Sequence, residues 1–144
     1  MRNTILAALL ILAAALSRLL PHPLNFTPIA AMALAGGVYL DKRFALIVPL
    51  IALAISDWII GLYPILFFVY ASFLLIGIIG IWLRAHKKPL IVFASTLVGS
   101  ILFFIVTNFG VWLTGWYPQT AAGLSECFIA AIPFFRNFLA STLI

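Results

Sequence analysis

The chain has 144 residues, of which 66% are hydrophobic and 8% are charged, and its mean hydropathy is +1.28. This composition excludes an ordinary soluble domain and predicts an integral membrane protein. Eight lysines and arginines against three acids give a net charge of +5, which in a membrane chain indicates topology rather than nucleic-acid binding. We therefore expect a single transmembrane helical domain over residues 1–144, partnered by the lipid bilayer and by no nucleic acid.

Apolar segments separated by loops and charge clusters predict a bundle of six transmembrane helices. About 20 helical residues cross the hydrocarbon core of a bilayer, and the chain has room for about six such spans with short connections. The first segment is assigned to a span rather than to a cleaved signal peptide, because no small-x-small cleavage site follows it. In chain order the predicted helices cover residues 5–20, 27–40, 44–62, 65–83, 90–114 and 121–144.

The second predicted helix is too short to span a bilayer without help. Thr27 and Pro28 predict its start, as N-cap and first helical residue. At 1.5 Å per residue it covers about 20 Å, so we expect it to pack inside the bundle. Small residues four apart allow helix backbones to approach closely. The pairs with this spacing are Ala31/Ala35 and Ala33/Gly37.

Basic residues predict the orientation of the bundle. With six spans, the N-terminus, the second and fourth connections and the C-terminus lie on one side, while the opposite side has Arg18 near its surface. Because basic residues favour the cytoplasmic side, both termini are predicted to be cytoplasmic in a bacterial inner membrane. The basic residues on that side are Arg2, Lys42, Arg43, Arg84, Lys87 and Lys88.

Most of the remaining polar residues are predicted to gather at the outer end. Asp57 lies in the outer third of the third span, within the apolar stretch AISDWIIG, and Thr107 and Asn108 reach a similar depth in the fifth. An unpaired carboxylate in hydrocarbon is costly, so Asp57 must face protein, water or a cation. We predict an outward-facing, ligand-binding pocket there. Its candidate residues are Asn25, Asp57, Trp58, Asn108, Trp112, Trp116, Tyr117, Glu126, Arg136 and Asn137.

Each of these residues also has a structural interpretation. Asp57 could pair with Arg18 and only orient helices, and Glu126 suits the N-terminal dipole of the sixth helix. Tryptophan and tyrosine are common interface anchors. Arg136 lies within the sixth span and needs an acceptor. Pro133 frees a backbone carbonyl that Arg136 or Asn137 could use.

Several chemistries are not expected. The sequence has no P-loop, HExxH, CxxC or GxSxG motif, so an enzyme is not predicted. His22 and His86 are separated, and the single cysteine, Cys127, builds neither a disulfide nor a cysteine metal site. No metal and no cofactor of its own is therefore predicted. Polar residues thin out toward the cytoplasm, whereas a channel needs them at several depths.

Four segments resemble those of a bacterial family of small integral membrane proteins of unknown function. They are RLLPHPLNFTPIAA at 18–31, TNFGVW at 107–112, YP at 117–118 and IPFFRN at 132–137. More remotely, ISDWIIG at 55–61, the six-helix layout and the cytoplasmic termini resemble the substrate-binding S components of energy-coupling factor (ECF) vitamin transporters. That resemblance implies a vitamin-like small molecule bound at the outer side. It also implies a partner module of a transmembrane coupling protein and two ATPases.

Two alternatives remain open from the residues. The chain has little mass outside the membrane and many small residues suited to packing, which would also fit a structural or accessory subunit of a larger membrane complex. A further possibility gives Cys127 a role as a soft ligand to a metal-bearing cofactor such as a corrinoid. The dipole of the sixth helix would favour its thiolate, and the neighbouring Glu126 would oppose it.

Overall fold

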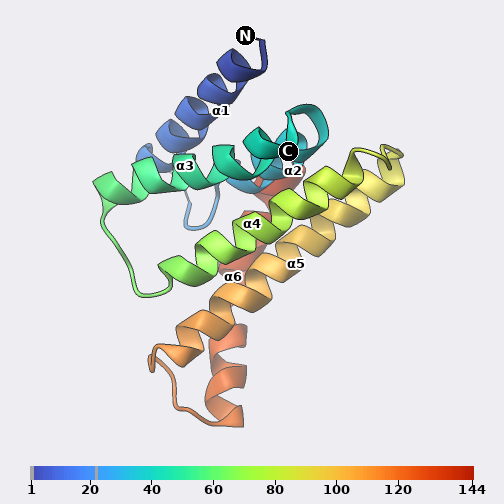
Figure 1. The fold of residues 1–144 in the computed structure, drawn as a ribbon. Coiled ribbons are helices and arrows are strands. Elements are labelled where there is room, and N and C mark those ends of the chain that lie inside the picture. The colour runs from blue at the N-terminus through green and yellow to red at the C-terminus, as the bar shows by residue number, and fades with distance from the viewer. Residues whose placement is uncertain (1, 22) are drawn as a thin grey trace.

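A computed structural model describes residues 2–21 and 23–144, and the described chain is all helical (Figure 1). Met1 and His22, the latter part of the predicted outer loop, lie outside the described residues. The helices are α1 (Arg2–Leu19), α2 (Ile29–Tyr39), α3 (Lys42–Ile60), α4 (Leu66–Leu83), α5 (Pro89–Leu113) and α6 (Ala121–Leu143). The predicted number and order of helices are confirmed. The second helix starts at Ile29 rather than at Pro28. Pro28, not Thr27, is its N-cap residue.

Among the described helices, α3, α4 and α5 are long and apolar enough to cross a membrane. α4 and α5 run side by side as a long antiparallel pair (Figure 1). α6 has 23 residues, but Glu126 and Arg136 interrupt its apolar sequence. With 11 residues, α2 covers about 16 Å at 1.5 Å per residue. The structure therefore describes a helical membrane protein with three helices suited to span.

The short helix α2 packs inside the bundle, as predicted, and contacts every other helix. Its closest approach is to α4. A Cβ atom added to Gly37 would lie 2.2 Å from the carbonyl carbon of Gly80, and one added to Gly80 would lie 2.7 Å from Leu34 O. Only glycine permits this backbone contact. Ala33 is fully buried at the same crossing, whereas Ala35 is exposed, so Ala33/Gly37 is the pair used for this close packing.

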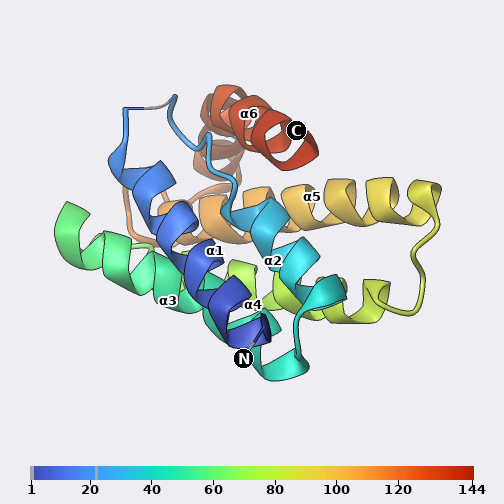
Figure 2. The same ribbon diagram turned by 90° about the horizontal axis from the view of Figure 1, so that it is seen from above.

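The segment between α1 and α2 turns into the bundle and lies beside α6 (Figure 2). Asn25 adopts a left-handed backbone with φ of 60°, which asparagine tolerates better than most residues. Asn137 Nδ2 donates to Leu24 O at 3.1 Å, and Ser141 Oγ donates to Thr27 O at 3.0 Å. The segment therefore delivers the start of α2 directly to the core, which explains why α2 is short.

The core beneath this segment is aromatic. Ile29 has no exposed surface, and it packs with Phe73, Phe103 and Phe138. The rings of Phe103 and Phe138 are stacked, with centroids 4.1 Å apart and planes 6° apart. Phe73 meets Phe103 at 5.3 Å with a tilted ring. These contacts join α2, α4, α5 and α6 at one level of the bundle.

Arginines mark the two ends of the bundle, which we name after them. At the Arg18 end, α1 and α3 end and α4 begins; at the Arg84 end, α2 and α4 end. Arg84 donates from Nε and Nη2 to Gly37 O at 3.1 and 2.9 Å, and from Nη2 to Leu40 O. These are carbonyls that the last turn of α2 leaves without helical partners. Arg84 therefore fixes the C-terminus of α2.

Candidate functional site

A cavity of about 370 Å³ lies at the Arg18 end, bounded by the segment that enters the bundle and by residues of α1 to α6. Its size falls in the range of small-molecule sites, which is about 300–1,000 Å³. The apolar residues that line it are Leu24, Ile29, Leu53, Ile65, Val69, Phe73, Phe103, Val111 and Phe138. The polar residues that line it are Arg18, Asn25, Thr27, Tyr63, Thr107 and Asn108.

The floor of the cavity is the aromatic core. Phe73, Phe103 and Phe138 are each at least nine-tenths buried, and they come from three different helices. Packed rings from separate helices form a floor that resists deformation. A flat ring could lie against such a surface.

The helix α5 contributes two polar residues to the wall. Thr107 Oγ1 donates to Phe103 O and Asn108 Nδ2 donates to Phe104 O, each at 2.7 Å. Both bonds return to the same helix one turn earlier, so each side chain keeps an oxygen that can accept, and the Asn108 amide also keeps its second N–H. The wall formed by α5 therefore offers acceptors to a bound molecule.

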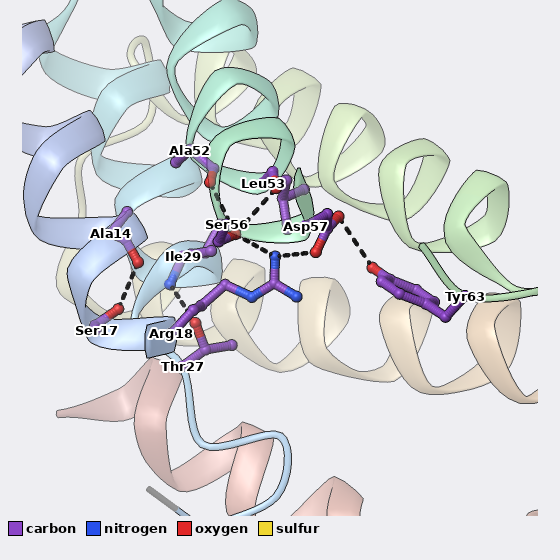
Figure 3. A network of polar contacts seen from close by, with 10 residues as sticks. All are labelled: Ala14, Ser17, Arg18, Thr27, Ile29, Ala52, Leu53, Ser56, Asp57 and Tyr63. Carbon is purple, nitrogen blue, oxygen red and sulfur yellow. Dashed lines mark hydrogen bonds and ion pairs between the residues drawn. The ribbon is translucent and has the colours of Figure 1, made fainter. Parts of the chain in front are cut away.

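On the opposite wall, Arg18 joins α1 to α3 (Figure 3). Its Nη1 donates to Ser56 Oγ at 2.6 Å and lies 2.7 Å from Asp57 Oδ1. Ser56 Oγ donates in turn to the backbone oxygens of Ala52 and Leu53, each at 2.9 Å. Asp57 is 1% exposed and pairs with Arg18, which is the structural interpretation that the sequence offered for it. Asp57 lies behind Arg18 and does not line the cavity.

Tyr63, in the loop between α3 and α4, completes this wall. Its hydroxyl donates to Asp57 Oδ2 at 3.4 Å, a long bond (Figure 3). Burial, and next the charge of Asp57, raise the pKa of Tyr63 to about 12. The phenol therefore stays neutral at physiological pH and remains a donor toward Asp57. Its oxygen can also accept a bond from a molecule in the cavity.

The cavity gathers part of the predicted ligand-binding set. Asn25 and Asn108 line it, and Asp57 lies directly behind its wall. Trp58 does not line the cavity, because it lies about a quarter turn from Asp57 on α3, on the outside of the bundle, and is 87% exposed. Trp112, one turn after Asn108 on α5, does not line this cavity. Trp112 instead donates from Nε1 to Pro118 O at 2.9 Å and holds the loop between α5 and α6.

The other predicted residues lie outside the cavity lining. Trp116 is 75% exposed, and Tyr117 is half-buried in the same loop. Glu126 and Arg136 are exposed on α6. Of the two residues that a carbonyl freed by Pro133 could serve, Asn137 instead donates to Leu24 O, 113 residues away in sequence. Tertiary contact, not helix geometry, sets the partner of Asn137.

Cys127 is buried, its thiol donates to Asn108 O at 3.3 Å, and it is not among the residues that line the cavity. Residues that the sequence did not single out as ligand-binding are Arg18, Tyr63 and the three phenylalanines of the floor. The sequence could have identified Arg18, because it is the one basic residue predicted near the outer surface. No sequence feature distinguished the three phenylalanines of the floor, because the chain has 13 phenylalanines and most of its positions are apolar.

The chain belongs to a family of unknown function, described as "Family of unknown function (DUF6580)", whose model matches residues 1–144. This agrees with the family resemblance found in the sequence. No curated protein and no solved structure matches the chain. The function therefore has to be argued from the site.

Proposed function

We propose that this chain is a substrate-binding subunit of a membrane transporter, of the type found as S components in energy-coupling factor systems. It would lie in the bacterial inner membrane with six spans and both termini in the cytoplasm. Its ligand would be a small vitamin or cofactor precursor, held in the cavity at the Arg18 end, which would face outward. A transmembrane coupling protein with two ATPases would supply the energy, since the sequence has no phosphate-binding loop.

The observation that carries this proposal is the makeup of the cavity. A closed aromatic floor lies below Arg18, Asn25, Tyr63 and Asn108. A few convergent polar groups above an apolar surface are the usual design of a small-molecule site. A residue set that served packing alone would fill about 370 Å³ with side chains.

A ligand screen tests the proposal. The purified chain, in detergent micelles, would be heated with a panel of vitamins and cofactor precursors. A ligand present at 100 times its dissociation constant stabilises the folded state by about 2.7 kcal/mol, so we expect the melting temperature to rise by several degrees. Val111→Trp, which fills the cavity, should remove the response. Ile105→Trp on the exposed face of the same helix should keep it. No response to any compound in the panel would contradict a ligand-binding role.

A second function has one observation in its favour. Glu126 and Arg136 are exposed on α6, and neither forms an ion pair with any residue in the described part of the chain. Charges that face away from a membrane bundle are costly unless another chain or water covers them. A structural or accessory subunit of a larger complex would use them for contact with a neighbour. Affinity purification distinguishes the two functions: ATPases that co-purify support transport, and a stable complex without them supports the structural role.

A further inference from the structure

Among the described residues, Arg18 is held through one nitrogen of its guanidinium. Its contacts with Ser56 and Asp57 both involve Nη1. Within residues 2–21 and 23–144, no hydrogen bond of ordinary geometry engages Nε or Nη2 of Arg18, and Figure 3 draws the contacts of Arg18 with Ser56 and Asp57 from Nη1. Nε and Nη2 form the side edge of the guanidinium, on which two N–H groups point in parallel. Because Arg18 lines the cavity, this edge is available to a bound molecule.

Arg84 shows what this edge does when it is occupied. Its Nε and Nη2 both donate to Gly37 O, and Nη2 donates also to Leu40 O. Among the described residues, the same two nitrogens therefore have acceptors of ordinary hydrogen-bond geometry in Arg84 and none in Arg18. The N–H groups of this edge reach water through the cavity, and a bound molecule that replaces this water has to supply acceptors in its place. We infer that the ligand supplies them.

The charge of the wall decides what kind of acceptor fits. Asp57 already neutralises Arg18, with 2.7 Å between the charged atoms. Arg18 is the one charged side chain among the described residues that line the cavity. A bound carboxylate or phosphate would add a negative charge near buried Asp57 with no second cation to balance it. The pair of acceptors should therefore be uncharged.

Resting on the proposed function, we propose that the ligand of this cavity is an uncharged oxo-heterocycle, such as a purinone or pteridinone. Its adjacent carbonyl oxygen and ring nitrogen accept from Nη2 and Nε of Arg18, in the geometry by which arginine reads the O6 and N7 edge of guanine. A ring N–H donates to the free oxygen of Asn108, on the facing wall. The flat ring lies on the phenylalanine floor.

Two matched pairs of probes test this ligand class by titration calorimetry. Hypoxanthine and adenine differ in a 6-oxo against a 6-amino group, which exchanges an acceptor for a donor. We expect hypoxanthine to bind at least about tenfold more tightly, because a site built for an acceptor rejects a donor in its place. Pterin and pterin-6-carboxylate differ in charge, and we expect the neutral pterin to bind more tightly.

Variants then assign the preference to the Arg18 edge. Arg18→Lys keeps a cation beside Asp57 but removes the two parallel donors, so hypoxanthine should bind at least about tenfold more weakly. Arg84→Lys makes the same change at a distance from the cavity and should leave binding unchanged. Asn108→Leu should weaken hypoxanthine binding through the facing wall, which provides a second reading if Arg18→Lys folds poorly. Melting temperatures of all three variants show which remain folded.

The results that would overturn the ligand class differ from those that would overturn the proposed function. Tighter binding of adenine or of the carboxylate, or equal affinities within both pairs, would overturn the ligand class and leave the proposed function standing. Hypoxanthine affinity unchanged in both Arg18→Lys and Asn108→Leu would also overturn it. If no vitamin or precursor of any class binds the wild-type chain, the proposed function fails and this inference fails with it.

Discussion

The two ends of the bundle both join helices through an arginine, but the two guanidinium groups bond differently. Each places an arginine between helices, Arg84 against the C-terminus of α2 and Arg18 between α1 and α3. Arg84 donates only to backbone oxygens and uses the full side edge of its guanidinium. Arg18 binds a buried carboxylate and a hydroxyl through one nitrogen and turns its other donors to a cavity. An arginine that donates from both nitrogens of its side edge to the backbone joins helices and does nothing else, whereas an arginine held through one nitrogen can join helices and also bind a ligand.

The largest effect should come from removing the cation at the Arg18 end. Arg18→Met leaves Asp57, which is 1% exposed, as a buried charge without a partner. Breaking a buried pair on one side costs about 3–5 kcal/mol, so we expect the free energy of unfolding to fall by that amount. Unfolding of the purified protein in mixed micelles, followed by circular dichroism, measures it.

The double variant Arg18→Met with Asp57→Leu is the control for that experiment. Replacing both charges by apolar groups removes the stranded carboxylate, and most of the lost stability should return. A double variant no more stable than Arg18→Met alone would show that the two side chains act independently, contrary to the 2.7 Å contact.

A smaller effect is expected at the Arg84 end. Arg84→Met leaves Gly37 O and Leu40 O without their side-chain donor, and such losses cost about 1–3 kcal/mol. Ligand binding should not change, because Arg84 lies outside the cavity lining. Hydrogen exchange of the α2 amides should speed up toward Tyr39. Faster exchange at Ile29 but not at Tyr39 would contradict the fastening role of Arg84.

Asp57→Asn tests the role of charge at the Arg18 end, because it keeps the shape of Asp57 and removes its charge. Arg18 lines the cavity and can be hydrated there, so the loss of stability should be about 1 kcal/mol, less than for Arg18→Met. The cation would then be unbalanced, and the preference between pterin and pterin-6-carboxylate should move toward the carboxylate. An unchanged preference, measured by calorimetry, would mean that Asp57 does not set the charge of the cavity.

The smallest effect concerns Tyr63. Its folded-state pKa of about 12 exceeds the ordinary value of 10.0. This phenol therefore contributes stability that is fully present below about pH 10 and is lost as the pH rises through about 12. The difference in absorbance near 295 nm between the wild type and Tyr63→Phe should develop only near pH 12. A difference complete by pH 10 would mean that Tyr63 is not held by burial and Asp57.

The cavity could be predicted from the sequence only in part. The sequence pointed to Asp57 because a carboxylate in an apolar run needs a partner. Arg18 was the basic residue available on the same side. Asn25 and Asn108 followed from their depth along the chain. Trp58, Trp116 and Arg136 had the same apparent depth, yet they point out of the bundle. Depth is a property of sequence position, whereas rotation about the helix axis depends on what packs against it.

The sequence by itself determined the helical class, the order of the six helices and the buried position of the short second one. These follow from apolar length, from proline and charge at the segment ends, and from small residues at four-residue spacing. The tertiary structure alone decided that the segment before α2 enters the bundle, that three phenylalanines from separate helices form one floor, and that Arg18 is held through Nη1 by the described residues of α3. Contacts between distant segments fix these features, because in a chain that is 66% hydrophobic many apolar faces are chemically equivalent until they are packed.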